Sequence, residues 1–178
     1  TARDLRMTTP LPPLIESILA ALAGVPDTLS ACYRLRTLDG VVETPDSGEF
    51  TSVDGTWNIE YGETAFNQDH LASLRWATEH QFSSVPEFVH CHDLSPHQWV
   101  LFTRLDPKGW RGLISYQTAV IQWIAKSEHV EVARREVELL ARAGWCNGYI
   151  LRGLTYWRFC PITQRIIFGG WGGIETVE

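Results

Sequence analysis

The sequence predicts a single-domain α+β fold in which antiparallel hairpins and a small meander pack against three to four helices. Strand-like runs are joined by tight turns such as Asp39-Gly40 and Asp54-Gly55, which favours hairpins over parallel crossovers. The helical segments do not alternate with strands as they do in a parallel sheet. The chain has 178 residues, of which 44% are hydrophobic and 20% charged, a composition typical of a protein with one buried core.

One domain is expected over residues 1–178, because no linker, repeat or low-complexity tract divides the chain. Residues 1–9 are expected to form a flexible N-terminal segment. Met7 is the only methionine, and we expect translation to begin there, with residues 1–6 derived from an upstream start or a cloning vector. The longest apolar windows are shorter than a membrane span, so no membrane segment is expected.

The first helix is predicted within residues 10–24, PLPPLIESILAALAG. The prolines suit its first turn and Gly24 suits its C-cap. Its apolar residues share one face, namely Leu14, Ile15, Ile18, Leu19 and Leu22. Two predicted hairpins follow, which would form an acidic antiparallel meander: residues 31–38 with 41–43, and residues 50–53 with 56–61.

Asn67 is expected to cap a helix that runs to residue 80, with an inward face made of Leu71, Leu74 and Ala77 or Thr78. Residues 98–105 predict a strand, and residues 106–109 a turn. The segment 114–125 fits both strand alternation and helical spacing. We predict a helix there from about Tyr116.

Residues 127–143 predict the longest helix, with one apolar stripe formed by Val130, Ala133, Val137 and Leu140. Its charged residues are interpreted as a solvated face with favourable pairs one turn apart. The remaining sequence predicts a terminal hairpin, with strands at 149–159 and 165–168 around a turn at 161–164.

Negative charge is concentrated in one part of the chain. The net charge is -6, and nine of the 21 carboxylate side chains lie between residues 27 and 69. An acidic protein is poorly suited to general nucleic-acid binding, whereas an acidic surface complements a basic protein partner. The alternative is that the more basic second half of the chain neutralises this charge within the fold.

The leading functional hypothesis is therefore a non-enzymatic protein-binding domain. We expect an inhibitor of the antitoxin or immunity type, which covers a basic site of its partner through an acidic face. Its predicted contact residues are Asp46, Glu49, Asp54, Trp57, Glu60 and Glu63. Eight tryptophans provide either a large core or interface anchors, and Trp57 is the anchor expected here. No cofactor is expected, and the sequence leaves enzymatic activity and oligomeric state open.

A second hypothesis concerns residues 88–99, FVHCHDLSPHQW. Imidazole and carboxylate groups are zinc ligands, so His90, His92 and Asp93 are candidate residues of a small metal-dependent hydrolase. Their spacing matches no familiar ligand pattern. Asp93 to Pro96 is instead typical of a turn, and we interpret the stretch as a loop that leads into the strand at Gln98.

A third hypothesis is a single-stranded nucleic-acid binder that uses the C-terminal hairpin. Arginines alternate there with aromatic side chains, an arrangement that can hold stacked bases. Arg158 and Trp157 are its expected contacts, although the acidic composition makes nucleic acid an unlikely partner. The four cysteines form no CxxC pair, which favours free thiols and a cytoplasmic location.

Overall fold

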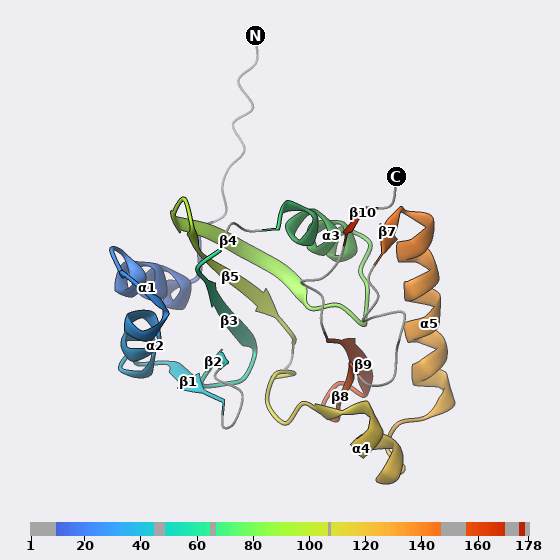
Figure 1. Cartoon of the computed structure of the whole chain (residues 1–178). Helices are drawn as coiled ribbons and strands as arrows, with labels where there is room; N and C mark the ends of the chain where they lie inside the picture. The colour runs from blue at the N-terminus through green and yellow to red at the C-terminus, as the bar shows by residue number, and fades with distance from the viewer. Residues whose placement is uncertain are drawn as a thin grey trace.

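The structure is a computed structural model, and it describes residues 10–44, 49–64, 67–106, 108–146, 156–169 and 175–176. This part of the chain contains five helices and a five-stranded antiparallel sheet of order β1-β2-β3-β5-β4. Three of the helices lie beside this sheet, and the last two along the chain lie beside the C-terminal strands (Figure 1). The α+β class is therefore confirmed. None of the described helices is both long and apolar enough to cross a membrane.

The first three strands form an antiparallel meander that contains the predicted hairpin of residues 50–53 and 56–61. The other predicted hairpin, residues 31–38 with 41–43, does not form, and β1 pairs with β2. β3 lies at the centre of the sheet and pairs with both β2 and β5. β5 corresponds to the predicted strand at residues 98–105, and it pairs with β4 along most of its length. The strand bounds are β1 Val41–Glu43, β2 Phe50–Ser52, β3 Trp57–Gly62, β4 Glu87–Ser95 and β5 Gln98–Arg104.

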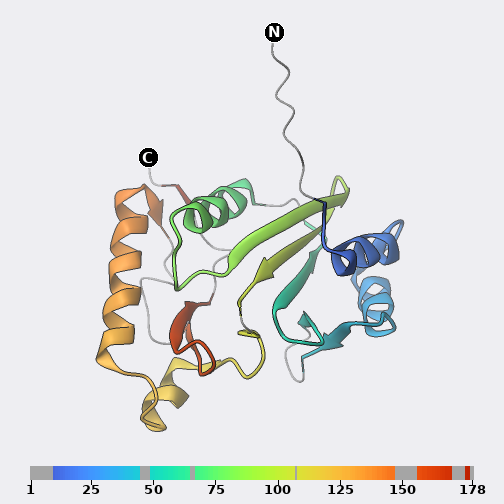
Figure 2. The same cartoon turned by 180° about the vertical axis from the view of Figure 1, so that it is seen from behind.

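The sheet is covered on both faces, because side chains alternate along each strand. On one face, Val100 and Phe102 pack with helices α1 (Pro13–Leu22) and α2 (Thr28–Arg36). On the other face, Leu101 packs in a second core that includes α3 (Gln68–Glu79). Figure 2 shows α1 and α2 on one side of the sheet and α3 on the other.

The C-terminal part of the chain completes the second core. A three-stranded sheet of order β6-β8-β9 contains the predicted terminal hairpin, and α4 and α5 begin at the predicted positions. The predicted strand residues 149–155 lie outside the described residues. The bounds are β6 Ile114–Ser115, α4 Tyr116–Ile121, α5 Ser127–Arg142, β7 Trp145–Cys146, β8 Trp157–Cys160, β9 Arg165–Phe168 and β10 Glu175–Thr176.

The predicted strand at residues 31–38 is wrong, because most of it belongs to helix α2. The Asp27 carboxylate accepts a hydrogen bond from the Ser30 backbone N–H at 2.7 Å and caps this helix. Ala31 and Leu35, one turn apart, are both buried against the sheet. Asp39-Gly40 remains a turn, but it joins a helix to β1 and not two strands.

The predicted loop at residues 88–97 is also wrong, because this stretch is extended through Ser95 as strand β4. The strand has irregular register near Val89 and Leu94, where bulges interrupt its pairing with β5. The hairpin turn falls at Pro96-His97, later than the expected turn at residues 93–96. Pairing with β5 outweighs the local turn preference of this sequence.

Helix α5 buries one charged residue, Glu136. The predicted solvated face rests on two pairs, Glu131–Arg135 and Glu138–Arg142. Glu136 belongs to neither pair and is only 7% exposed. Its carboxylate accepts hydrogen bonds from the Ser83 N–H at 2.5 Å, the Ser83 hydroxyl at 3.0 Å and the Ser84 N–H at 2.7 Å. The Ser84 carbonyl accepts a further bond from the Phe168 N–H at 2.9 Å. The segment before β4 is thus bonded to both α5 and β9.

We expect Glu136→Ala to lower the free energy of unfolding by about 2–4 kcal/mol, because it leaves buried backbone donors without an acceptor. Urea denaturation followed by tryptophan fluorescence measures this change. Glu138→Ala, on the exposed side of the same helix, is the matched control and should change stability by less than about 0.5 kcal/mol. Equal effects of the two variants would contradict the anchoring role of Glu136.

Candidate functional site

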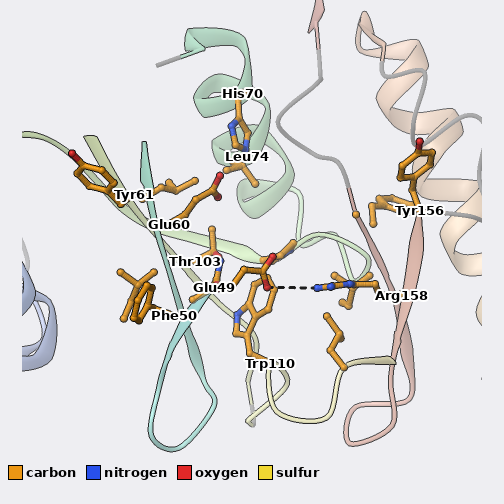
Figure 3. A pocket seen from close by; sticks show the side chains of 18 of the residues that line it. Glu49, Phe50, Glu60, Tyr61, His70, Leu74, Thr103, Trp110, Tyr156 and Arg158 are labelled. Carbon is orange, nitrogen blue, oxygen red and sulfur yellow. Dashed lines mark ion pairs between the residues drawn. The ribbon is translucent and has the colours of Figure 1, made fainter. Parts of the chain in front are cut away.

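A cavity of about 690 Å³ lies beside β3 and extends from α2 to β8 (Figure 3). Within the described residues, β2 pairs only with Asn58 and Ile59, so the edge of β3 is open from Glu60 onward. The cavity follows this open edge. Its volume falls within the range of roughly 300–1,000 Å³ that is usual for small-ligand sites.

Glu60 extends from β3 into this cavity, and Figure 3 shows its carboxyl group on the side of the sheet that faces α3. Glu60 is exposed to water over more than a third of its surface. The protein atoms around it still remove part of its hydration, which raises the pKa of Glu60 above its usual value, and the negative charge of Glu49 raises it further. Glu60 makes no hydrogen bond or ion pair with any other described residue.

His70 lines the same cavity from α3, and its side chain is buried. Burial lowers the pKa of His70 from 6.5 to about 4, so its imidazole is neutral at pH 7. The Asn67 cap fixes where α3 begins. His70 therefore lies in the first turn of the helix, with its side chain facing inward. The sequence pattern indicated Leu71 for this inward position, and Leu71 is only half-buried.

Four residues that line the cavity each have a buried polar atom without a hydrogen-bond partner in the described part of the chain. These atoms are the side-chain oxygen Oδ1 of Asn58, the hydroxyl oxygen of Tyr61 and the indole nitrogens Nε1 of Trp110 and Trp157. Asn58 is 9% exposed and Trp157 is 4% exposed. Buried polar groups normally have partners, so these atoms indicate a site that a bound molecule or ordered water would complete.

Glu49 and Arg158 approach each other at the cavity wall. Their closest oxygen and nitrogen atoms are 3.9 Å apart, and both side chains are nearly half exposed. This contact joins a residue of the predicted acidic face to a residue of the predicted nucleic-acid site. Such an exposed pair adds little to stability, but it balances the charge of Glu49.

The remaining predicted contact residues are spread over the fold. Asp54 accepts bonds from the Ser52 hydroxyl and the Thr56 N–H, which lower its pKa and stabilise the turn between β2 and β3. Glu63 accepts a bond from the N–H of Thr28, the first residue of α2. Asp46 lies outside the described residues.

Trp57 and Glu60 lie on opposite faces of β3. Trp57 packs beside the core under α1 and α2, and the Arg104 guanidinium lies 5.7 Å from the centre of its ring. Glu60 occupies the face that borders the cavity. Of the five predicted contact residues that the structure describes, only Glu49 and Glu60 come together at the cavity.

The candidate metal residues occupy β4, where His90 and His92 share one face and their ring centroids are 6.0 Å apart. Asp93 points to the other face of the sheet. No group of three His, Cys, Asp or Glu side chains suited to a metal ion occurs among the described residues. Between the histidines, burial raises the pKa of the Cys91 thiol to about 11, so it is protonated at pH 7.

Most of the cavity wall could not be identified from sequence motifs, because its residues come from segments far apart in the chain. His70, Trp110 and Asn58 belong to no recognised pattern. The sequence contains one weaker indication of the cavity. Glu60 is a charged residue in the middle of a strand, and its neighbours in the chain are Ile59 and Tyr61. No family model, curated protein or solved structure matches the chain.

We expect His70 to make the stability depend on pH. Its folded-state pKa of about 4 is below its unfolded value of 6.5, so unfolding takes up a proton between these values. Stability from neutral His70 is complete above pH 6.5 and falls by up to about 3 kcal/mol as the pH drops towards 4. The His70→Gln variant should lose this part of the slope.

Chemical denaturation at a series of pH values between 4 and 7 measures that slope. His97→Gln, which changes an exposed histidine in the turn between β4 and β5, is the control and should keep the wild-type slope. An unchanged slope in His70→Gln would show that the imidazole is not held neutral by burial.

Proposed function

We propose that this chain is a non-enzymatic protein-binding domain whose cavity receives a cationic side chain of a basic partner. The observation that carries this proposal is Glu60, a carboxylate beside the open edge of β3 that has no counter-ion among the described residues. An inhibitor of the antitoxin or immunity type is the class we propose, since such an inhibitor covers basic residues of its partner.

The electrostatics of the cavity favour a cation. Burial and the nearby charge of Glu49 both disfavour ionised Glu60, and a bound cation would relieve this cost. Arg158 offsets much of the charge of Glu49, but no described residue does the same for Glu60. An approaching ammonium or guanidinium group would therefore find one uncompensated carboxylate in a partly desolvated site.

The contacts of the other carboxylates indicate which part of the acidic region is available to a partner. Asp54 and Glu63 hold local turns and helix ends, and Glu43 pairs with Arg36 at 2.5 Å. Because these carboxylates already accept hydrogen bonds within the chain, they are less available to bind a partner. The proposed contact surface thus centres on the cavity and not on the whole acidic region. The free thiols of Cys32, Cys91 and Cys160 support the proposal of a reducing, cytoplasmic setting.

Propylguanidinium, which reproduces the end of an arginine side chain, tests the proposed capture of a cation. We expect it to bind and to bind more tightly than propylurea, its neutral analogue of similar shape. Glu60→Gln should weaken propylguanidinium binding by at least about tenfold, because it removes the charge of the acceptor. Isothermal titration calorimetry or NMR titration at low salt measures these affinities.

Glu138→Gln is the matched control, since it removes one negative charge from an exposed position on α5. This variant should bind propylguanidinium as the wild type does. Equal affinity for propylguanidinium and propylurea, or an unaltered affinity in Glu60→Gln, would reject the proposal.

A further inference from the structure

We infer that the cavity recognises an arginine residue together with an adjacent peptide group of the partner, and not a cation alone. This inference rests on the proposed function and specifies its ligand. It comes from buried polar atoms without a described partner on four residues that line the same cavity as Glu60. These atoms are Asn58 Oδ1, Trp110 Nε1, Trp157 Nε1 and the Tyr61 hydroxyl, which can either donate or accept.

The unpaired atoms require two kinds of partner. Asn58 Oδ1 is a hydrogen-bond acceptor and needs a donor, as does the Glu60 carboxylate. The two indole N–H groups of Trp110 and Trp157 are donors and need acceptors. A guanidinium or ammonium group carries donors only, so a bare cation would leave both indoles unpaired.

A peptide group supplies the missing chemistry, because its carbonyl accepts hydrogen bonds and its N–H donates one. An arginine residue within a chain therefore offers all the required partners at once. Its guanidinium can donate to Glu60 and Asn58, and neighbouring carbonyls can accept from Trp110 and Trp157.

Arginine suits this cavity better than lysine for two reasons. Its planar group presents several N–H donors in a fixed arrangement, which matches a carboxylate and a nearby amide oxygen. It also stacks on aromatic rings, and the wall includes the indoles of Trp110 and Trp157. A lysine ammonium is a compact, strongly hydrated charge and gains less from either feature.

The test compares N-acetyl-arginine methylamide, its lysine counterpart and propylguanidinium on the full chain. We expect the arginine amide to bind about three- to tenfold more tightly than propylguanidinium, owing to the added hydrogen bonds. The lysine amide should bind more weakly than the arginine amide. In NMR spectra, the indole N–H signals of Trp110 and Trp157 should shift downfield with the arginine amide only.

Trp157→Phe keeps an aromatic ring in the core but removes the indole donor. It should reduce the advantage of the arginine amide over propylguanidinium, because only the amide offers a carbonyl acceptor to the indole N–H. Trp123→Phe is the control, because Trp123 is 86% exposed and does not line the cavity. The wild-type indole signals give the same information should the Trp157 variant fold poorly.

The possible results separate this inference from the proposed function. Equal binding of propylguanidinium and the arginine amide, with unshifted indole signals, overturns the inference but leaves capture of a cation intact. Equal binding of the lysine and arginine amides overturns the preference for arginine. Failure of every cationic probe to bind overturns the proposed function itself and the inference with it.

Discussion

The buried carboxylate of Glu136 is the contact on which the second half of the structure depends. It accepts three hydrogen bonds from Ser83 and Ser84, in the segment between α3 and β4. The same segment bonds to Phe168 of β9 through the Ser84 carbonyl. One short stretch of backbone thereby connects the main sheet, the longest helix and the C-terminal hairpin. Because these bonds join residues more than fifty positions apart, they hold together parts of the core that local structure cannot.

The cavity is a consequence of this arrangement. The C-terminal hairpin is held opposite the face of β3 that carries Asn58 and Glu60. Among the described residues, β2 pairs with β3 only at Asn58 and Ile59 and leaves the edge beside Glu60 uncovered. A polar carboxylate, a neutral histidine and unpaired indole donors therefore face one space. The carboxylate and the indole donors lose hydration in the fold without gaining a hydrogen-bond partner among the described residues. This cost is unfavourable for folding alone, and it is the physical reason for interpreting the cavity as a binding site.

Prediction from the sequence succeeded where local signals agree with tertiary packing. The Asn67 cap, the Asp54-Gly55 turn and the apolar stripe of α5 each specify an element within a few residues of its observed position. It failed where local and long-range preferences differ. Residues 31–35 alternate in a way that fits a strand, but the Asp27 cap and burial of both Ala31 and Leu35 favour a helix. The HCHD stretch resembles a loop until β5 provides its partner strand.

The candidate site shows the same division. From the chain alone one can locate the acidic region, and Glu49 and Glu60 within it, because composition and charge are properties of the sequence. Which carboxylates have a partner depends on contacts between distant residues. Glu49 forms an ion pair with Arg158, and Glu63 accepts a hydrogen bond from the first residue of α2. Glu60 has no such partner among the described residues. The alternation of side chains along a strand is enough to predict that Trp57 and Glu60 lie on opposite faces of β3. Only the packed sheet shows which of these faces borders the cavity. Periodicity and caps act over a few residues, so they determine elements, whereas the burial and pairing of polar groups arise only when those elements pack together.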